Sequence, residues 1–162
     1  MKQGSNTLKQ SERIQLIPYS DEYLPYFRKW LKDDFSMYMM FLGPFTDEQI
    51  DAWPTAGDQI TLLVKNKDGE IIGFSDFHHF KKETGIAKHG TFIDPAFRGR
   101  GYGKLTLFQS IQYGFNELGL ERIEVAVREE NRASKKNIES NGFVFEKYDP
   151  EKKKYHYFIN KV

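Results

Sequence analysis

The spacing of apolar residues changes from strand-like to helix-like within the first 31 positions. Residues 13–18 (RIQLIP) alternate apolar and polar side chains up to a proline, which predicts a first strand. A set of aromatic and aliphatic residues then recurs at helical intervals: Tyr23, Tyr26, Phe27, Trp30 and Leu31. Their shared face predicts an amphipathic helix, for which Ser20 or Asp21 is available as the N-cap.

Residues 35–45 (FSMYMMFLGPF) are rich in aromatic residues and methionine but follow no clear period. Two interpretations stay open, namely a core segment followed by a loop, or a flexible wall of a substrate pocket. Residues 47–53 predict a short helix before Pro54. Asp33 and Asp34, just upstream, either form a surface pair at a helix end or attract a cationic amine.

Beyond residue 59 the pattern predicts mainly short strands joined by turns. Residues 60–66 and 71–80 predict two strands linked by an Asp68-Gly69 turn, and residues 86–93 predict a third. Residues 102–118 predict a helix whose buried face carries Phe108, Ile111, Phe115 and Leu118, with Gly119 after its end. The remaining predicted elements are a strand at 122–127, a short helix at 133–140 and a hairpin formed by 143–147 and 154–159. Residues 1–12 are polar without a period and predict a flexible leader.

Composition narrows the classes of function without selecting one. The 162 residues carry 24 Lys and Arg against 23 Asp and Glu, so the formal charge of +1 gives no field that would attract nucleic acid or an anionic membrane. Cysteine is absent and no apolar run is long enough to cross a membrane, so we expect a protein of the reducing cytoplasm. Four histidines without a metal-ligand spacing give no expectation of a metal.

A glycine-rich segment lies between a predicted strand and a predicted helix: Arg98-Gly99-Arg100-Gly101-Tyr102-Gly103-Lys104. Free amide groups at a helix N-terminus bind anions, phosphates above all, and the three basic residues add positive charge. The alternative is a turn that needs glycine only for its positive φ angles. A P-loop is excluded because Leu105 follows Gly103-Lys104, and a dinucleotide fingerprint fails at Lys104 or at Thr106.

The segment does fit the pattern [RQ]-x-x-G-x-[GA] through Arg98, Gly101 and Gly103. This resembles the acetyl-CoA signature of the GCN5-related N-acetyltransferase (GNAT) family. The runs Asn131-Arg132-Ala133-Ser134 and Asn141-Gly142-Phe143 look like the second block of that family. The resemblance covers residues 13–159 and looks most like the branch of ribosomal-protein N-terminal and spermidine acetyltransferases. It implies a single α/β (α+β) domain over residues 13–162, with a mixed, mostly antiparallel twisted sheet flanked by helices.

The resemblance also implies acetyl-CoA as the cosubstrate. Backbone amides of residues 99–104 would hold the pyrophosphate, and Phe92 and Ile93 would hydrogen-bond the pantetheine arm as an added strand does. That arm would fill a gap where the strand 86–93 splays from the strand 122–127. Asn131 would contact the pantetheine, and Ser134 would lie near the thioester sulfur. The implied binding residues are Phe92, Ile93, Arg98, Gly99, Arg100, Gly101, Tyr102, Gly103, Lys104, Asn131 and Ser134.

Two departures from the family pattern affect the catalytic groups. Many members have a glutamate eleven residues before the position of Arg98 and a tyrosine four residues before that of Gly142, where this chain has Ala87 and Ile138. His89 shares a strand face with Ala87, so it is our candidate for the general base. The alternative for His89 is a partly buried structural histidine.

The other catalytic candidates are weaker. Ser134 is the candidate acid, or only a hydrogen-bond donor to sulfur, because a serine hydroxyl is a poor acid. His78 and His79 on the neighbouring strand are alternative bases, and only one of them can face the cleft. A backbone N–H on the strand of Phe92 is available to stabilise the oxyanion.

These observations predict an N-acetyltransferase that acts on a primary amine of a small molecule or of a protein N-terminus, as a monomer or homodimer. A non-catalytic domain that binds an acyl-CoA is the alternative, supported by the loss of both usual catalytic side chains. An RNA-associated domain is a third possibility, suggested by residues 98–101 and the lysines at 152–154, and the near-zero net charge opposes it.

Overall fold

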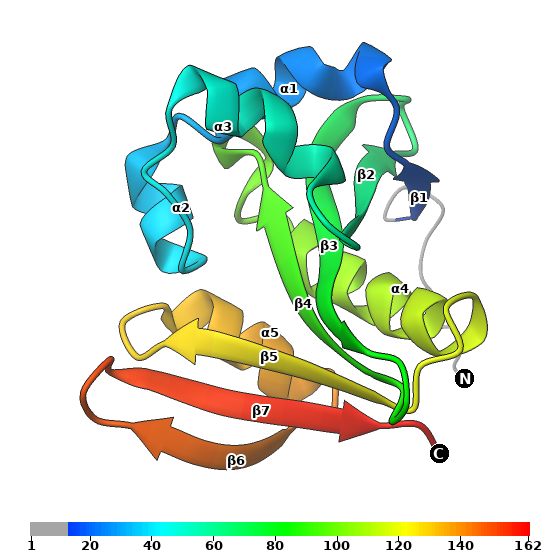
Figure 1. Cartoon of the computed structure of the whole chain (residues 1–162), viewed down its shortest axis with the longest axis vertical. Helices are drawn as coiled ribbons and strands as arrows, with labels where there is room; N and C mark the ends of the chain where they lie inside the picture. Colours follow the sequence, from blue (N-terminus) through cyan, green and yellow to red (C-terminus); the bar gives the residue numbers. More distant parts are fainter. Residues whose placement is uncertain (1–12) are drawn as a thin grey trace.

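One sheet organises residues 13–162, which are the residues that this computed structural model describes; the predicted leader 1–12 lies outside them. Seven strands follow the order β1-β2-β3-β4-β5-β7-β6 across that sheet (Figure 1). All neighbours are antiparallel except β4 and β5, which run parallel. The strands are β1 Ile14–Pro18, β2 Ile60–Asn66, β3 Ile71–Lys81, β4 Ile86–Ile93, β5 Arg122–Arg128, β6 Val144–Asp149 and β7 Lys154–Asn160.

Helices cover both faces of the sheet. Figure 1 shows α4 and α5 behind it, while the three short helices of the first third of the chain lie on the other side. The helices are α1 Leu24–Trp30, α2 Asp34–Met39, α3 Asp47–Ala52, α4 Tyr102–Asn116 and α5 Arg132–Ser140, with 3-10 turns at Asp21–Tyr23, Trp53–Thr55 and Pro95–Phe97. This arrangement confirms the predicted α/β (α+β) domain with a mixed, mostly antiparallel sheet.

Each face of the sheet has its own apolar core. The α4 core contains Leu62, Phe77, Ala87, Leu107, Ile111, Leu120, Ile123, Val125, Val127, Ile138, Phe143 and Tyr157. The α1 core contains Phe27, Trp30, Leu31, Met37, Ile50, Leu63, Phe74 and Phe92. Strand alternation sends the neighbours Leu62 and Leu63 to opposite cores. The middle of β2 is therefore buried on both sides, which explains its continuous apolar run at residues 62–64.

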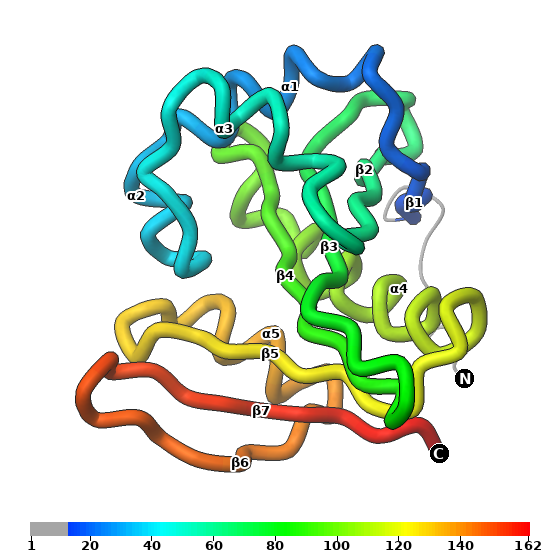
Figure 2. Tube along the Cα trace, in the orientation of Figure 1, coloured from blue at the N-terminus to red at the C-terminus, as the bar shows by residue number. Residues whose placement is uncertain are grey.

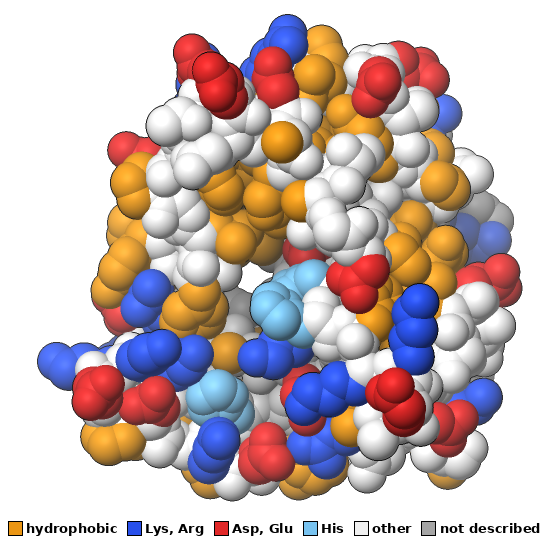
Figure 3. Space-filling model, viewed as in Figure 1, with side chains coloured by type: hydrophobic (Ala, Val, Ile, Leu, Met, Phe, Trp, Pro, Cys, Tyr) orange, Lys and Arg blue, Asp and Glu red, His pale blue; other side chains and the backbone are white. Residues whose placement is uncertain are grey.

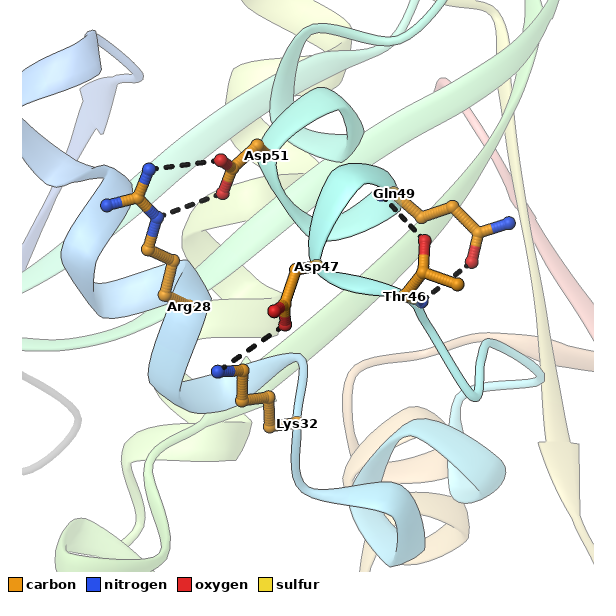
Figure 4. A network of polar contacts seen from close by, with 6 residues as sticks. All are labelled: Arg28, Lys32, Thr46, Asp47, Gln49 and Asp51. Atoms are coloured by element: carbon orange, nitrogen blue, oxygen red, sulfur yellow. Dashed lines mark hydrogen bonds and ion pairs between the residues drawn. The ribbon is translucent and has the colours of Figure 1, made fainter.

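Polar contacts hold α1 against α3 (Figure 4). Two ion pairs join α1 and the residues just after it to α3, namely Arg28–Asp51 at 2.9 Å and Lys32–Asp47 at 3.6 Å. Thr46 and Gln49 form a reciprocal capping box at the start of α3, as the side chain of each accepts from the backbone amide of the other. These helices therefore form a braced layer over the α1 core.

The parallel pair separates after three residues. Ile86, Ala87 and Lys88 of β4 pair with Arg122, Ile123 and Glu124 of β5, and no later β4 residue pairs with β5 in the described chain. Figure 2 shows the two traces diverging from that end. The predicted splay of this strand pair is confirmed, and it leaves one edge of residues 90–93 without a neighbouring strand.

The structure corrects two details of the sequence analysis. Residues 35–45 were not expected to be helical, yet α2 occupies their first half, begun by an Asp33 side chain that accepts from the Ser36 amide. Phe108 was expected on the buried face of α4 but is 45% exposed. At Gly114 the helix approaches the sheet so closely that a β carbon would lie 2.9 Å from Ile123 Cδ1, and this contact sets the rotation of α4.

Candidate functional site

The loop before α4 has the conformation of an anion site. Gly99 and Gly101 have φ angles of +80° and +86°, and a β carbon on either would meet no atom within 4 Å. Glycine is therefore required there by the backbone conformation. Within the described chain, no backbone or side-chain acceptor receives the amides of residues 99–104. Since the first turn of the 15-residue α4 holds no acidic residue, these amides and the helix dipole favour an anion.

The side chain of Arg98 turns inward, toward the sheet and α2. Its Nε donates to the carbonyl oxygen of Ile93 at 2.7 Å, and its terminal nitrogen donates to Oγ of Ser36 at 3.2 Å. The guanidinium also lies 5.3 Å from the centre of the Phe92 ring. The structure thus uses Arg98 to anchor the loop, while the guanidinium of Arg100 is exposed and donates to the Ala96 carbonyl at 3.4 Å.

The two sequence blocks meet at the first turn of α4. A β carbon on Gly103 would lie 3.0 Å from the amide nitrogen of Asn137 in α5. Asn141 donates to the carbonyl of Lys104 at 3.2 Å. Because α4 and α5 each follow one of the two diverging parallel strands, their N-termini flank the gap between β4 and β5. Ligands of α/β proteins bind at this kind of position, outside the carboxyl ends of diverging strands.

Asn131 and Ser134 lie in the first turn of α5. The side-chain oxygen of Asn131 accepts from the Ser134 amide at 3.3 Å, so Asn131 is the N-cap of the helix. Both side chains are half-buried. The Asn-x-x-Ser spacing therefore has a structural basis as a helix start, and it fixes both residues beside the splayed strands.

His89 lies on the face of β4 toward α4, inside a buried hydrogen-bond chain. Its Nε2 is 2.8 Å from Oγ of Ser75, which is 2.8 Å from Oγ of Ser110, whose hydroxyl donates to the Thr106 carbonyl. Each oxygen has one hydrogen to give, so the chain is satisfied when Nε2 of His89 carries the ring proton. The hydrogen-bond geometry thus selects one neutral tautomer of His89.

Burial governs the protonation of His89. Its side chain is 6% exposed, and this burial, with a smaller contribution from the charge of His78, lowers the pKa of His89 to about 3. A ring that is enclosed against α4 and resists protonation fits the structural alternative better than the role of a base. The candidate from sequence is thus placed away from the face on which α1–α3 lie.

His78 lies on the opposite face, paired with a buried carboxylate. Its Nδ1 is 2.6 Å from Oδ2 of Asp76, and the side chains of His78 and Asp76 are 31% and 2% exposed. Burial raises the pKa of Asp76, and the hydrogen bond from His78 opposes part of that rise. Sequence analysis named His78 as an alternative base but gave no role to Asp76, although the spacing of two residues on a strand was a signal that both share a face.

A groove of about 780 Å³ adjoins the open end of the splay. Arg128 at the end of β5 reaches across to α2, where its Nε donates to the Tyr38 carbonyl at 2.6 Å and its guanidinium stacks 3.7 Å from the Tyr38 ring. Asp34 lines this groove, whereas Asp33 is used as the cap of α2. Figure 3 also shows a hollow near the centre of this face, with a histidine patch at its edge and basic side chains below it.

No group of three or more His, Cys, Asp or Glu side chains in residues 13–162 is arranged to hold a metal ion. None of the helices in that range is long and apolar enough to cross a membrane.

Comparisons with known proteins agree with this geometry. Residues 13–144 match the family model described as the acetyltransferase (GNAT) domain. The chain is 31% identical to the uncharacterized N-acetyltransferase p20 of Bacillus licheniformis over 124 residues, covering 70% of this chain and 68% of that protein. It is 24% identical to the human alpha/beta-tubulin-N-acetyltransferase 9, covering 83% of this chain and 73% of that protein.

Two solved structures share the fold. A spermidine N-acetyltransferase from Vibrio cholerae in complex with CoA and spermine superposes with a TM-score of 0.84 at 18% identity, covering 91% of this chain and 95% of that chain. A dodecameric structure of spermidine N-acetyltransferase from the same organism has a TM-score of 0.75 at 18% identity, with coverage of 91% and 93%. At this level of identity the likeness is one of fold.

Proposed function

The chain belongs to the GNAT acetyltransferase family, and we propose that it transfers an acetyl group from acetyl-CoA to a primary amine of a small molecule or a protein N-terminus. One observation supports this most strongly. The splayed β4 edge and the unpartnered amides before α4 lie at the same end of the parallel strand pair. An extended ligand with a diphosphate at one end has the shape and the hydrogen-bonding groups for such a site.

The binding groups match the parts of acetyl-CoA. The amides of residues 99–104 receive the pyrophosphate, with Arg100 and Lys104 exposed beside them. The unpaired edge of β4 at Phe92 and Ile93 receives the amide groups of the pantetheine as an added strand. Asn131 and Ser134 contact the arm from the α5 side, with Ser134 nearest the sulfur.

The reaction needs alignment, proton transfer and stabilisation of one negative charge. The site aligns the amine with the thioester carbonyl, and holding two reactants together contributes a large share of the acceleration. A backbone N–H of the free β4 edge donates to the oxyanion that forms. The amine loses two protons during acetylation, one of which ends on the CoA sulfur and the other in solvent.

The structural relatives favour a small-molecule amine as the acceptor, because the superposed acetyltransferase is named for spermidine and was crystallised with spermine. The tubulin acetyltransferase among the sequence relatives supports a protein amine as the second class to assay. A monomer or homodimer stays a prediction for this chain.

Thermal unfolding with and without acetyl-CoA tests the proposal. A ligand present at 100 times its Kd stabilises the fold by about 2.7 kcal/mol. Gly101→Glu places a negative side chain at the anion site, and Gly119→Glu is the matched control, since Gly119 also has a positive φ and open space but lies beyond the other end of α4. We expect acetyl-CoA to stabilise the wild type and the control but not Gly101→Glu.

A turnover assay then distinguishes an acetyltransferase from a non-catalytic domain that only binds an acyl-CoA. Release of free thiol is measured with spermidine, with a peptide that has a free N-terminus and with a small amino compound. Stabilisation without thiol release on any acceptor would favour the non-catalytic acyl-CoA-binding domain. Absence of stabilisation at millimolar acetyl-CoA would contradict both.

A further inference from the structure

Resting on the proposed function, we infer that His78 is the general base that deprotonates the acceptor amine and that buried Asp76 is its positioning residue. The pair is formed by Nδ1 of His78 and Oδ2 of Asp76, 2.6 Å apart. It lies on β3, on the sheet face opposite His89.

The hydrogen bond defines which ring nitrogen is available. Asp76 is 2% exposed and acts as the acceptor, so the Nδ1 atom of His78 carries the ring proton and donates it. The lone pair of a neutral imidazole is then on Nε2, which has no hydrogen-bond partner among the described residues. With 31% of its side chain exposed, His78 is open to a substrate while its partner is enclosed. A carboxylate that orients a partly exposed imidazole in this way is the arrangement used for general-base catalysis.

Strand register places the pair beside the point where the sheet opens. His78 pairs with Lys88, which is the last β4 residue that pairs with β5, and Asp76 pairs with Gly90. Between Gly90 and Ile93 the free β4 edge runs for three residue steps, about 10 Å. A ligand held by its pyrophosphate near α4 and extended along this edge brings its acyl end to Gly90. Asp76 pairs with Gly90 there, and His78 follows two residues further along β3 on the same face.

Gly90 allows the Asp76 carboxylate to pack directly against the backbone of β4. A β carbon there would lie 2.8 Å from Oδ1 of Asp76 and 3.2 Å from Cε of Met40. Oδ1 is a buried oxygen without a hydrogen-bond partner in residues 13–162. Such orphaned acceptors are rare in folded proteins, and a catalytic role is one of the explanations for them. The close packing on Gly90 fixes the carboxylate, so that Oδ2 is held for Nδ1 of His78.

The step balances without any further reactant. Nε2 of His78 takes a proton from the ammonium, and the freed amine attacks the carbonyl carbon of the thioester. The carbon–sulfur bond breaks and the thiolate leaves with the proton that the imidazolium returns. The nitrogen that attacked gives its second proton to solvent as the amide forms. The titratable and charged groups around the ring are Asp76 and His79 on β3, Lys88 on β4 and, through the sheet, His89. The uncharged Met40, after α2, packs on Gly90 beside them.

The variant His78→Gln tests the inference, with His156→Gln as the matched control, since this histidine lies on β7 and pairs with Ala126 of β5. We expect kcat/KM of His78→Gln to fall by about 10²–10⁴-fold while the Kd of acetyl-CoA stays within twofold. The difference in kcat/KM between His78→Gln and the wild type narrows as the pH approaches the pKa of the acceptor amine, because a larger share of the amine then arrives deprotonated. A purely structural role for His78 would not give this pH dependence. His156→Gln keeps kcat/KM within about twofold of the wild type.

Asp76→Asn tests the positioning role separately. We expect a lower kcat with KM nearly unchanged, and partial recovery in Asp76→Glu, which restores a carboxylate. If His78→Gln acetylates as the wild type does, with the same pH profile, the inference is overturned while the proposed function stands. If the wild type binds acetyl-CoA but acetylates no acceptor, or does not bind it, the proposed function fails and the inference fails with it.

Discussion

Gly73 of β3 and Phe92 of β4 approach so closely that a β carbon on Gly73 would overlap the carbonyl oxygen of Phe92 and press on Cα of Ile93. The contact is between backbones, so no side chain can rotate to relieve it. Because Gly73 has no side chain, β3 packs closely against one edge of β4. This packing sets the position of the opposite, free edge of β4, which we propose as the pantetheine site.

Gly73→Ala should move β4 away from β3 and disturb the free edge. We expect the free energy of unfolding to fall by about 1–3 kcal/mol, as for other overpacked sites, and acetyl-CoA to bind more weakly. Chemical denaturation and a binding titration measure the two effects. In Gly57→Ala the added carbon meets no atom and lies far from β4, so this control should lose stability through its positive φ but keep the affinity for acetyl-CoA. Unchanged affinity in Gly73→Ala would contradict the proposed pantetheine edge.

His89→Gln should flatten the acid dependence of stability. The pKa of His89 is about 3 in the fold against 6.5 for an ordinary histidine. As the pH falls through this window, only the unfolded chain gains the proton, so the fold loses stability by up to about 1.4 kcal/mol per pH unit. Replacement by glutamine removes this loss. Denaturation at pH 7, 6 and 5 measures the slope for both proteins.

Burial raises the pKa of Asp76, which acts in the opposite direction, because the folded carboxyl takes up its proton at a higher pH than the unfolded one. This contribution is common to wild type and variant and cancels in their difference. Leu107→Ala is the control, since it removes apolar burial without a titrating group and should lower stability equally at each pH. Parallel slopes for wild type and His89→Gln would show that His89 titrates normally.

Asp94→Ala should destabilise the junction between β4 and the glycine loop. The carboxylate of Asp94 accepts from Nε1 of Trp30 at 2.9 Å, from the amide of Ala96 at 2.9 Å and from Lys29 at 3.2 Å. Loss of this acceptor leaves the buried Trp30 N–H unpaired, which costs about 1–3 kcal/mol. Burial raises the pKa of Asp94, but these hydrogen bonds together leave it below its ordinary value. The stabilisation is thus full at neutral pH and is lost in acid as the folded carboxyl takes up a proton, which denaturation at pH 7 and pH 3 can measure.

Local signals explain which elements were predicted from sequence. The bounds of β2 and β4 agree with the prediction. The signals for these bounds are local, because turn residues directly flank each strand in the sequence. The helix α2 was missed because Phe35 and Tyr38 are exposed, so its aromatic residues do not trace one buried face. In α4 the rotation depends on the contact of Gly114 with the sheet, which no pattern within the helix shows.

For the candidate site, too, some parts could be predicted from sequence and others could not. The loop 98–104 depends on consecutive residues and could be predicted from them. The choice between His78 and His89 could not, because alternation relates residues within one strand but does not tell which face meets α4. That information comes from the register of β3 with β4 and from the helices packed on each side.

The arginines at positions 98 and 100 should give opposite results when each is changed to alanine. Arg98 is bonded to the Ile93 carbonyl and to Ser36, so Arg98→Ala should lower the free energy of unfolding without ligand by about 1–2 kcal/mol. Arg100 is exposed beside the proposed pyrophosphate site, so Arg100→Ala should leave that stability unchanged but weaken acetyl-CoA binding and reduce its dependence on salt. Denaturation without ligand and titrations at two salt concentrations distinguish the two residues. Equal stability in both variants would contradict the anchoring role of Arg98, and equal salt dependence of wild type and Arg100→Ala would contradict the phosphate contact.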